Sequence, residues 1–229
     1  MANNVIAIIQ ARMGASRLPN KMLLSLRGTP LIDWVIGRVS QAAKIDQVVV
    51  AIPDTADNQV LADHVRKQGG TVFLGSENDV VDRFAQAAQK VNATHIVRVC
   101  ADNPFIAWEC IDDLIDFYMY NPCDYVYNHI PRNNKFPDGL GAEMVARSVL
   151  ERINSEAKMP AQREHVFNYI WDNPDKFSIK TFDPLNKFLW HPELKLDIDT
   201  AEDLGKLAKL NVSPDMDAEQ IIKNILKGK

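Results

Sequence analysis

Short apolar segments alternate with amphipathic segments through the first hundred residues, and this alternation constrains the fold more than any other feature. Runs rich in valine and isoleucine predict buried strands at Val5–Gln10, Gln47–Ile52, Thr71–Leu74 and His95–Cys100. Apolar residues at helical spacing predict intervening helices at Leu31–Lys44, Ala56–Gln68 and Asp79–Val91. Strand, helix and strand in this order form βαβ units, so the pattern predicts a parallel sheet with right-handed crossovers.

The regular alternation of strands and helices ends after residue 100. Further helices are predicted at Ala107–Tyr120, Ser148–Ala157, Ala161–Trp171, Ala201–Leu210 and Asp217–Leu226. Further strands are predicted at Asp124–Tyr127, Ala142–Val145 and Phe177–Phe182. No repeat, low-complexity tract or long linker interrupts the 229 residues, so we expect residues 1–229 to form a single α/β domain with a mostly parallel sheet.

Charge and cysteine content exclude several classes of protein. The net charge of −4 argues against a nucleic-acid-binding or membrane-binding protein. Residues 1–40 nevertheless carry five basic residues and one acidic residue, a net charge of +4 that suggests a local anion site. The three cysteines have no CxxC spacing, and the sequence has no signal-peptide pattern and no run long enough to span a membrane. We therefore expect a cytoplasmic protein with no membrane partner.

A basic loop follows the first predicted strand, where α/β sheets place their ligands. It contains Arg12, Arg17 and Lys21 together with the small residues Gly14 and Ser16. Small residues let backbone N–H groups approach an anion closely, and the cations neutralise its charge. The loop predicts a polyphosphate site, although a solvated basic loop is the alternative.

The loop differs from the two best-known phosphate-binding motifs. Pro19 and Asn20 precede Lys21 where a Walker A motif needs a glycine, and Met22 follows where that motif needs serine or threonine. Only one glycine is present, so the dinucleotide fingerprint is also excluded.

The wider motif resembles the signature of the sugar cytidylyltransferases. The pattern Arg12-x4-Arg17-Leu18-Pro19-x-Lys21 is followed by Gly28-Thr29-Pro30-Leu31-Ile32. This group includes the CMP-Kdo synthetases, the acylneuraminate cytidylyltransferases and the spore-coat polysaccharide biosynthesis proteins, and later segments are most similar to the spore-coat branch. The resemblance implies a Rossmann-like sheet of the nucleotide-diphospho-sugar transferase type. Asn20 departs from the glycine usual in the family.

Three aspartates are candidate ligands of Mg²⁺, which binds oxygen ligands, typically one or two carboxylates with phosphates and water. Asp102 follows the fourth strand, where the resemblance implies a metal-binding aspartate, and Asn103 replaces the acidic residue usual beside it. Asp197 and Asp199 lie two apart, so in a strand they would face the same side. We expect Asp102 and Asp199 as ligands and Asp197 as the next candidate. The alternative for Asp199 is that it, or the residue after it, caps the following helix.

Substrate contacts are suggested by two segments similar to the spore-coat branch. Arg83 follows the third strand, where it contacts the nucleotide or pairs with a neighbouring aspartate. Arg163 and His165 lie in a segment that we place around the acceptor sugar, with Arg163 holding a carboxylate through two hydrogen bonds. The alternative is an ordinary helix surface with a partly buried His165.

Together these features imply an enzyme that transfers CMP from CTP to a sugar acid of the 3-deoxy-ulosonic or nonulosonic type and releases pyrophosphate. Arg12, Arg17 and Lys21 would hold the triphosphate with Mg²⁺. The resemblance further implies surface polysaccharide biosynthesis and a small β arm over residues 124–145 that serves homodimerisation. One alternative is an enzyme of the same fold that uses another nucleotide or a sugar-phosphate acceptor. A second is a nucleotide-sugar-binding protein with little catalysis.

Overall fold

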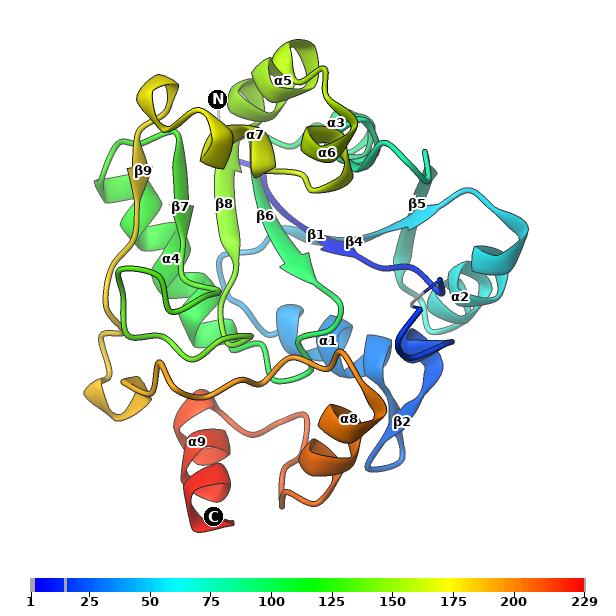
Figure 1. The fold of residues 1–229 in the computed structure, drawn as a ribbon, viewed down its shortest axis with the longest axis vertical. Coiled ribbons are helices and arrows are strands. Elements are labelled where there is room, and N and C mark those ends of the chain that lie inside the picture. The colour runs from blue at the N-terminus through cyan, green and yellow to red at the C-terminus, as the bar shows by residue number, and fades with distance from the viewer. Residues whose placement is uncertain (1–2, 15, 229) are drawn as a thin grey trace.

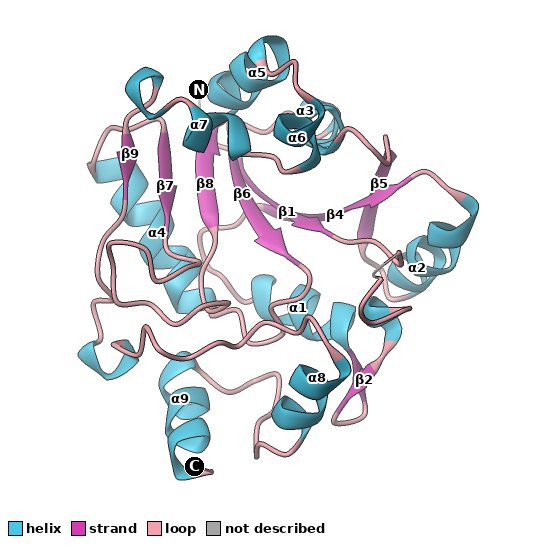
Figure 2. Ribbon diagram, viewed as in Figure 1, coloured by secondary structure: helices cyan, strands magenta, loops and turns pink. Residues whose placement is uncertain are grey.

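A seven-stranded sheet forms the centre of the computed structural model, which describes residues 3–14 and 16–228 (Figures 1 and 2). Its strand order is β5-β4-β1-β6-β8-β7-β9. Their bounds are β5 (Thr71–Gly75), β4 (Gln47–Pro53), β1 (Val5–Gln10), β6 (His95–Cys100), β8 (Glu143–Ala146), β7 (Tyr125–Tyr127) and β9 (Ile179–Lys180). The strands β5, β4, β1 and β6 pair in parallel, whereas β8 is antiparallel to both of its neighbours. The predicted α/β fold with a mostly parallel sheet is confirmed.

Helices cover both faces of the sheet because alternate residues of each strand point to opposite sides. Val5, Ala7 and Ile9 of β1 pack in one core cluster with the helices α1 (Leu31–Val39), α2 (Ala56–Lys67) and α4 (Trp108–Tyr120). Ile6 and Ile8 pack in a second cluster with α3 (Val80–Lys90), α5 (Arg147–Glu156) and α7 (Asn168–Asp172). Burial on both sides explains why β1 is apolar almost throughout.

The C-terminal helices close a third cluster below the sheet in Figure 1. They are α8 (Ala201–Ala208) and α9 (Ala218–Lys227), and the short helices η1 (Lys21–Leu23), η2 (Pro174–Lys176) and η3 (Lys187–Leu189) lie in loops. Thr200 caps α8 and Asp217 caps α9, each in a reciprocal capping box. None of the helices in the described part of the chain is both long and apolar enough to cross a membrane.

One prediction for the second half needs correction. The single helix predicted at Ala161–Trp171 is wrong, because α6 (Pro160–Glu164) ends at an extended His165 and α7 begins only after the buried Val166 and Phe167. Residues 124–145 contribute the strands β7 and β8 to the main sheet, and their role as a dimerisation arm stays a prediction. The small separate sheet pairs β2 (Ser25–Leu26) with β3 (Thr29–Pro30). The homodimer expected from the resemblance stays a prediction.

A buried polar network joins the parallel and antiparallel halves of the sheet. Arg98 of β6 lies directly opposite Glu143 of β8 and donates a hydrogen bond from Nη1 to Glu143 Oε1. The hydroxyl of Tyr125 donates to Glu143 Oε2, and His129 Nε2 lies 3.7 Å from Glu143 Oε1. Burial favours the neutral acid, but His129, Arg98 and the Tyr125 hydroxyl together hold the pKa of Glu143 below its usual value. Burial also lowers the pKa of His129.

The network should make the protein less stable in mild acid. The unfolded chain takes up a proton at His129 near pH 6.5, whereas the folded chain does so only at lower pH. The free energy of unfolding should therefore fall as the pH drops below about 6.5, and Glu143 should add a further loss at still lower pH. Urea unfolding at pH 7, 6 and 5 should show that the free energy of unfolding falls less in His129→Gln than in the unmodified protein. An equal fall in both proteins would mean that His129 does not titrate in this range.

Gly141 shows how tightly the loop before β8 is packed. The side chain of Asn128 is fully buried, donates from Nδ2 to Cys110 O (2.8 Å) and accepts at Oδ1 from Ala142 N (2.8 Å). A Cβ atom at position 141 would overlap Asn128 Oδ1 and the Asn128 carbonyl oxygen. This position therefore requires glycine.

Gly141→Ala should destabilise the protein by about 3 kcal/mol, because Asn128 would lose its buried hydrogen bonds or the loop would shift. Gly205→Ala is the matched control: it lies in α8 with no atom within 4 Å of the added carbon, so it should raise stability by about 0.5–1 kcal/mol. Urea denaturation of both variants measures the difference. Equal stabilities would contradict the packing argument.

Candidate active site

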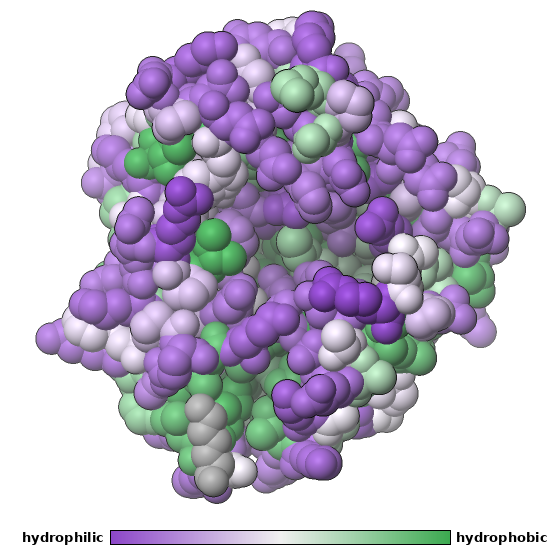
Figure 3. Space-filling view, in the orientation of Figure 1, coloured by the Kyte–Doolittle hydropathy of each residue, from purple (hydrophilic) through white to green (hydrophobic). Residues whose placement is uncertain are grey.

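A cavity of about 320 Å³ opens beside the carboxyl ends of β1 and β6. Figure 3 shows this face hollowed in the middle, with hydrophilic side chains along much of the rim. Seven of the residues predicted from the sequence line the cavity: Arg12, Ser16, Arg17, Lys21, Asp102, His165 and Asp199. A larger hollow of about 600 Å³ involves the amino-terminal ends of β4 and β5 instead. Because parallel sheets bind ligands at their carboxyl ends, the smaller cavity is the candidate site.

Lys21 lies at the centre of the charged groups. Its side chain is 10% exposed, and Nζ donates to the carbonyl oxygen of Ile198 at 2.8 Å. The same ammonium lies 3.5 Å from Asp102 Oδ2 and 3.8 Å from Asp199 Oδ1. Arg17 Nη2 lies 3.0 Å from Asp199 Oδ2. The structure thus brings together the basic loop and two of the predicted metal ligands, from three segments far apart in the sequence.

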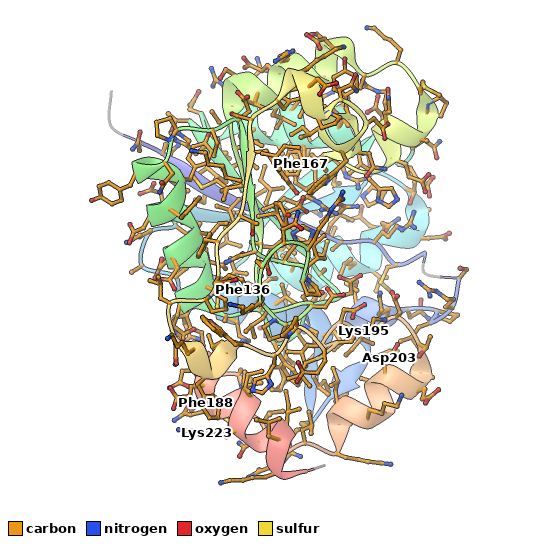
Figure 4. The ribbon with its side chains drawn as sticks, turned by 60° about the vertical axis from the view of Figure 1, so that its left-hand side comes forward. Phe136, Phe167, Phe188, Lys195, Asp203 and Lys223 are labelled. Carbon is orange, nitrogen blue, oxygen red and sulfur yellow. The ribbon has the colours of Figure 1, made fainter. Side chains whose placement is uncertain are left out.

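Asp197 and Asp199 do not lie in a strand. Residues 196–199 form no strand, and a single bridge joins Asp138 to Lys195. The two carboxylates are linked instead by Lys195, whose Nζ lies 3.2 Å from Asp197 Oδ2 and 3.7 Å from Asp199 Oδ2. Figure 4 shows Lys195 beside the start of α8. Thr200 caps that helix, so the Asp199 side chain is not needed as a cap.

The aspartates form an excess of negative charge. Burial raises the pKa of Asp197, with Lys195 opposing the rise and Asp102 adding to it. Burial and the nearby Asp197 likewise raise the pKa of Asp138. Within the described residues, Asp197 Oδ1 is buried without a hydrogen-bond partner. Such carboxylates would be stabilised by a further cation.

The donor set fits a partial magnesium site. Across residues 3–14 and 16–228, no group of three or more His, Cys, Asp and Glu side chains is arranged to hold a metal by itself. Asp102 and Asp199 nevertheless lie close to one common cation, Lys21 Nζ. Mg²⁺ is usually held through one or two carboxylates together with substrate phosphates and water, rather than by a closed protein cage.

Arg83 does not line the cavity, although it lies near enough to Arg12 for their positive charges to repel each other. Arg83 is almost fully buried and donates from Nη1 to Ser76 O at 2.6 Å, while Nε has no partner among the residues described. Burial lowers the pKa of Arg83 to about 10, and the positive charge of Arg12 contributes to that shift. Arg12 is exposed. Gly14 is exposed as well and does not line the cavity.

Arg163 is bound by other parts of the protein. Its Nε donates to Asp79 Oδ2 at 2.6 Å, its Nη2 to Asn154 Oδ1 at 2.6 Å, and its Nη1 to the backbone of Asn154 and Ala157. These hydrogen bonds fasten α6 to the start of α3 and the end of α5. Arg163 would have to exchange these partners to hold a carboxylate, so the clamp stays a prediction that these contacts oppose, whereas His165 of the same segment lies at the cavity.

Sequence reasoning missed Gln10, Arg98 and Cys100, which also line the cavity. A charged residue within an otherwise apolar strand was the available signal for Arg98. Burial raises the pKa of the Cys100 thiol to about 12, so this cysteine stays protonated at neutral pH.

Comparison with known proteins agrees with the fold. The sequence matches the cytidylyltransferase family over residues 6–224. It is 34% identical to the spore coat polysaccharide biosynthesis protein SpsF of Bacillus subtilis, over 96% of this chain and 93% of that protein. It is 36% identical to the 3-deoxy-manno-octulosonate cytidylyltransferase of Geobacter sulfurreducens, over 52% of this chain and 47% of that one.

A solved structure of a cytidylyltransferase from Leptospira borgpetersenii superposes with a TM-score of 0.89 at 30% identity, over 99% of this chain and 95% of that one. The match with the family covers nearly the whole chain, and the similarity to this structure and to SpsF does so as well. The chain therefore belongs to the cytidylyltransferase family of nucleotidyltransferases.

Proposed function

We propose that this enzyme transfers CMP from CTP to a hydroxyl group of a sugar acid of the 3-deoxy-ulosonic or nonulosonic type and releases pyrophosphate. The reaction would take place in the cytoplasm and serve surface polysaccharide biosynthesis. The observation that carries the proposal is the position of Lys21 Nζ between Asp102 and Asp199, beside Arg17. Cations and carboxylates interleaved in this way suit a metal-bound triphosphate. The Geobacter relative, named for cytidylyl transfer to 3-deoxy-manno-octulosonate, supports the choice of acceptor.

The basic residues would bind the triphosphate and stabilise the charge that develops on the departing pyrophosphate. Lys21 is preorganised for this role, because the Ile198 carbonyl holds its ammonium in place before any ligand arrives. Arg12 and Arg17 are exposed and can adjust to the outer phosphates. Ser16 lines the cavity and would approach the phosphates, whereas contacts of Gly14 with the phosphates and of Arg83 with the nucleotide stay predictions, because neither residue lines the cavity.

Asp102 and Asp199 would hold Mg²⁺ with phosphate oxygens, and Asp197 Oδ1 supplies a further unpaired oxygen. Bound Mg²⁺ would neutralise phosphate charge and lower the pKa of the attacking hydroxyl. No described side chain stands out as a general base. Catalysis would therefore come mainly from positioning and electrostatic stabilisation.

Pyrophosphate release tests the reaction directly. The protein is mixed with Mg²⁺, one of the four nucleoside triphosphates, and a sugar acid, a sugar phosphate or a neutral sugar. Release should occur with CTP and a sugar acid, because the site suits a metal-bound triphosphate and one relative is named a 3-deoxy-manno-octulosonate cytidylyltransferase. Release with another triphosphate or with a sugar phosphate would change the proposed substrates, but nucleotidyl transfer at this site would stand. No release from any combination, with no thermal stabilisation by CTP, would overturn the proposal.

Removing single cations tests the phosphate site. Lys21→Met should lower kcat/KM for CTP about 100-fold, because a preorganised charge beside the leaving group is lost. Arg17→Met should lower it about 10-fold, because Arg17 is exposed and screened. Its exposure also makes Arg17→Met a safeguard in case Lys21→Met fails to fold. Lys44→Met is the matched control, since Lys44 pairs with Asp116 away from the cavity and should leave activity unchanged. Unchanged CTP kinetics in both site variants would exclude these cations from phosphate binding.

A further inference from the structure

The floor of the cavity contains a second basic element that the phosphate site does not use. Arg98 lies in β6 two residues before Cys100, and both side chains line the cavity together with Gln10 of β1. Alternate residues of a strand share a face, so Arg98 and Cys100 lie on the same face of the sheet. His165, which follows α6, lines the same cavity. The Arg98 side chain is only 12% exposed.

The guanidinium of Arg98 is held rigidly from two sides. Its Nε donates to Gln10 Oε1 at 3.0 Å, and its Nη1 donates to Glu143 Oε1. Glu143 is itself fixed by the hydroxyl of Tyr125, which donates to its other oxygen. These contacts use two of the five N–H groups of the guanidinium. The Nη2 atom makes no hydrogen bond to any residue in the described part of the chain. It is also absent from the fully buried atoms that lack a partner, so it can reach solvent or a ligand.

A braced guanidinium with free donors at a cavity wall is suited to bind a planar anion. Two parallel N–H groups match the two oxygens of a carboxylate, and bracing removes the entropy cost of ordering a flexible side chain. Glu143 already compensates most of the positive charge, which favours a singly charged planar group over a doubly charged phosphate. Arg163 cannot fill this role, because its donors are bound to Asp79, Asn154 and Ala157.

We propose that Arg98 binds the carboxylate of the acceptor sugar acid and so determines acceptor specificity, with Gln10 and Glu143 as its positioning residues. This inference rests on the proposed function and deepens it. It assigns different residues of the cavity to different substrates: Arg12, Arg17 and Lys21 bind phosphates, and Arg98 binds the acceptor.

The test compares sugar acids with their methyl esters, which keep the sugar and lose the carboxylate charge. The probes are 3-deoxy-D-manno-octulosonic acid and N-acetylneuraminic acid, each with its ester. Pyrophosphate release with CTP and Mg²⁺ gives KM and kcat for each probe, and the thermal shift caused by CTP reports nucleotide binding. The protein should prefer an acid over its ester by about 100-fold in kcat/KM, the size of effect expected for a lost bidentate charged contact.

The variants separate the role of Arg98 in binding from its role in folding. R98M/E143Q removes both members of the buried pair, so that neither charge is left without a partner. It should raise KM for the acid at least about 30-fold, abolish the preference for acid over ester, and leave the thermal shift with CTP unchanged. R98K keeps the positive charge but loses the planar pair of donors. Its preference for acid over ester should therefore lie between those of the unmodified protein and R98M/E143Q. R98K also keeps the test valid if the double variant does not fold.

The matched control is R147M/E151Q, which removes an exposed ion pair from α5 and should change none of these values. The inference is overturned if R98M/E143Q or R98K keeps the full preference for acid over ester, or if the unmodified protein accepts ester and acid equally. Release with sugar phosphates or neutral sugars alone would also overturn it while leaving nucleotidyl transfer intact. Absence of both release and CTP stabilisation would instead refute the proposed function, and this inference with it.

Discussion

The ammonium group of Lys21 holds the candidate site together. It donates to the carbonyl of Ile198 and lies within 4 Å of carboxylates that follow β6 and precede α8. A buried ammonium is stable only where its hydrogen bonds and charge are satisfied, so the loop after β1 must meet both other segments in this arrangement. Arg17 and Lys195 then add to the same alternation of charge around Asp199. The basic N-terminal segment and the acidic remainder of the chain thus meet at one place.

Local sequence patterns predicted the parallel half of the sheet well because β1, β4 and β6 are mostly buried and therefore apolar. β1 and β6 have the predicted bounds, Val5–Gln10 and His95–Cys100, and the basic loop follows β1 as expected. The carboxyl ends of parallel strands lie at one edge, so the meeting of Lys21 with Asp102 also followed from topology.

The parts that sequence reasoning missed depend on contacts between distant residues. Glu143 meets Arg98 only through the antiparallel pairing of β8 with β6, which no local pattern fixes. The helix expected across His165 breaks because Val166 and Phe167 pack into the core. The sequence predicted that Arg163 binds a ligand, yet its Nε donates a hydrogen bond to Asp79, which is distant in the sequence. In each case tertiary packing outweighs local preference.

The contact between Lys21 and Ile198 spans 177 residues, and this separation has a consequence for synthesis on the ribosome. Chains emerge from the N-terminus at about 5–20 residues per second, so the basic loop is exposed many seconds before its carbonyl partner exists. During that time the loop lacks Asp199, Arg17 lacks its ion pair, and the parallel strands can already associate. The candidate site is therefore among the last parts of the molecule to be completed, because it needs the segment around Ile198 and Asp199.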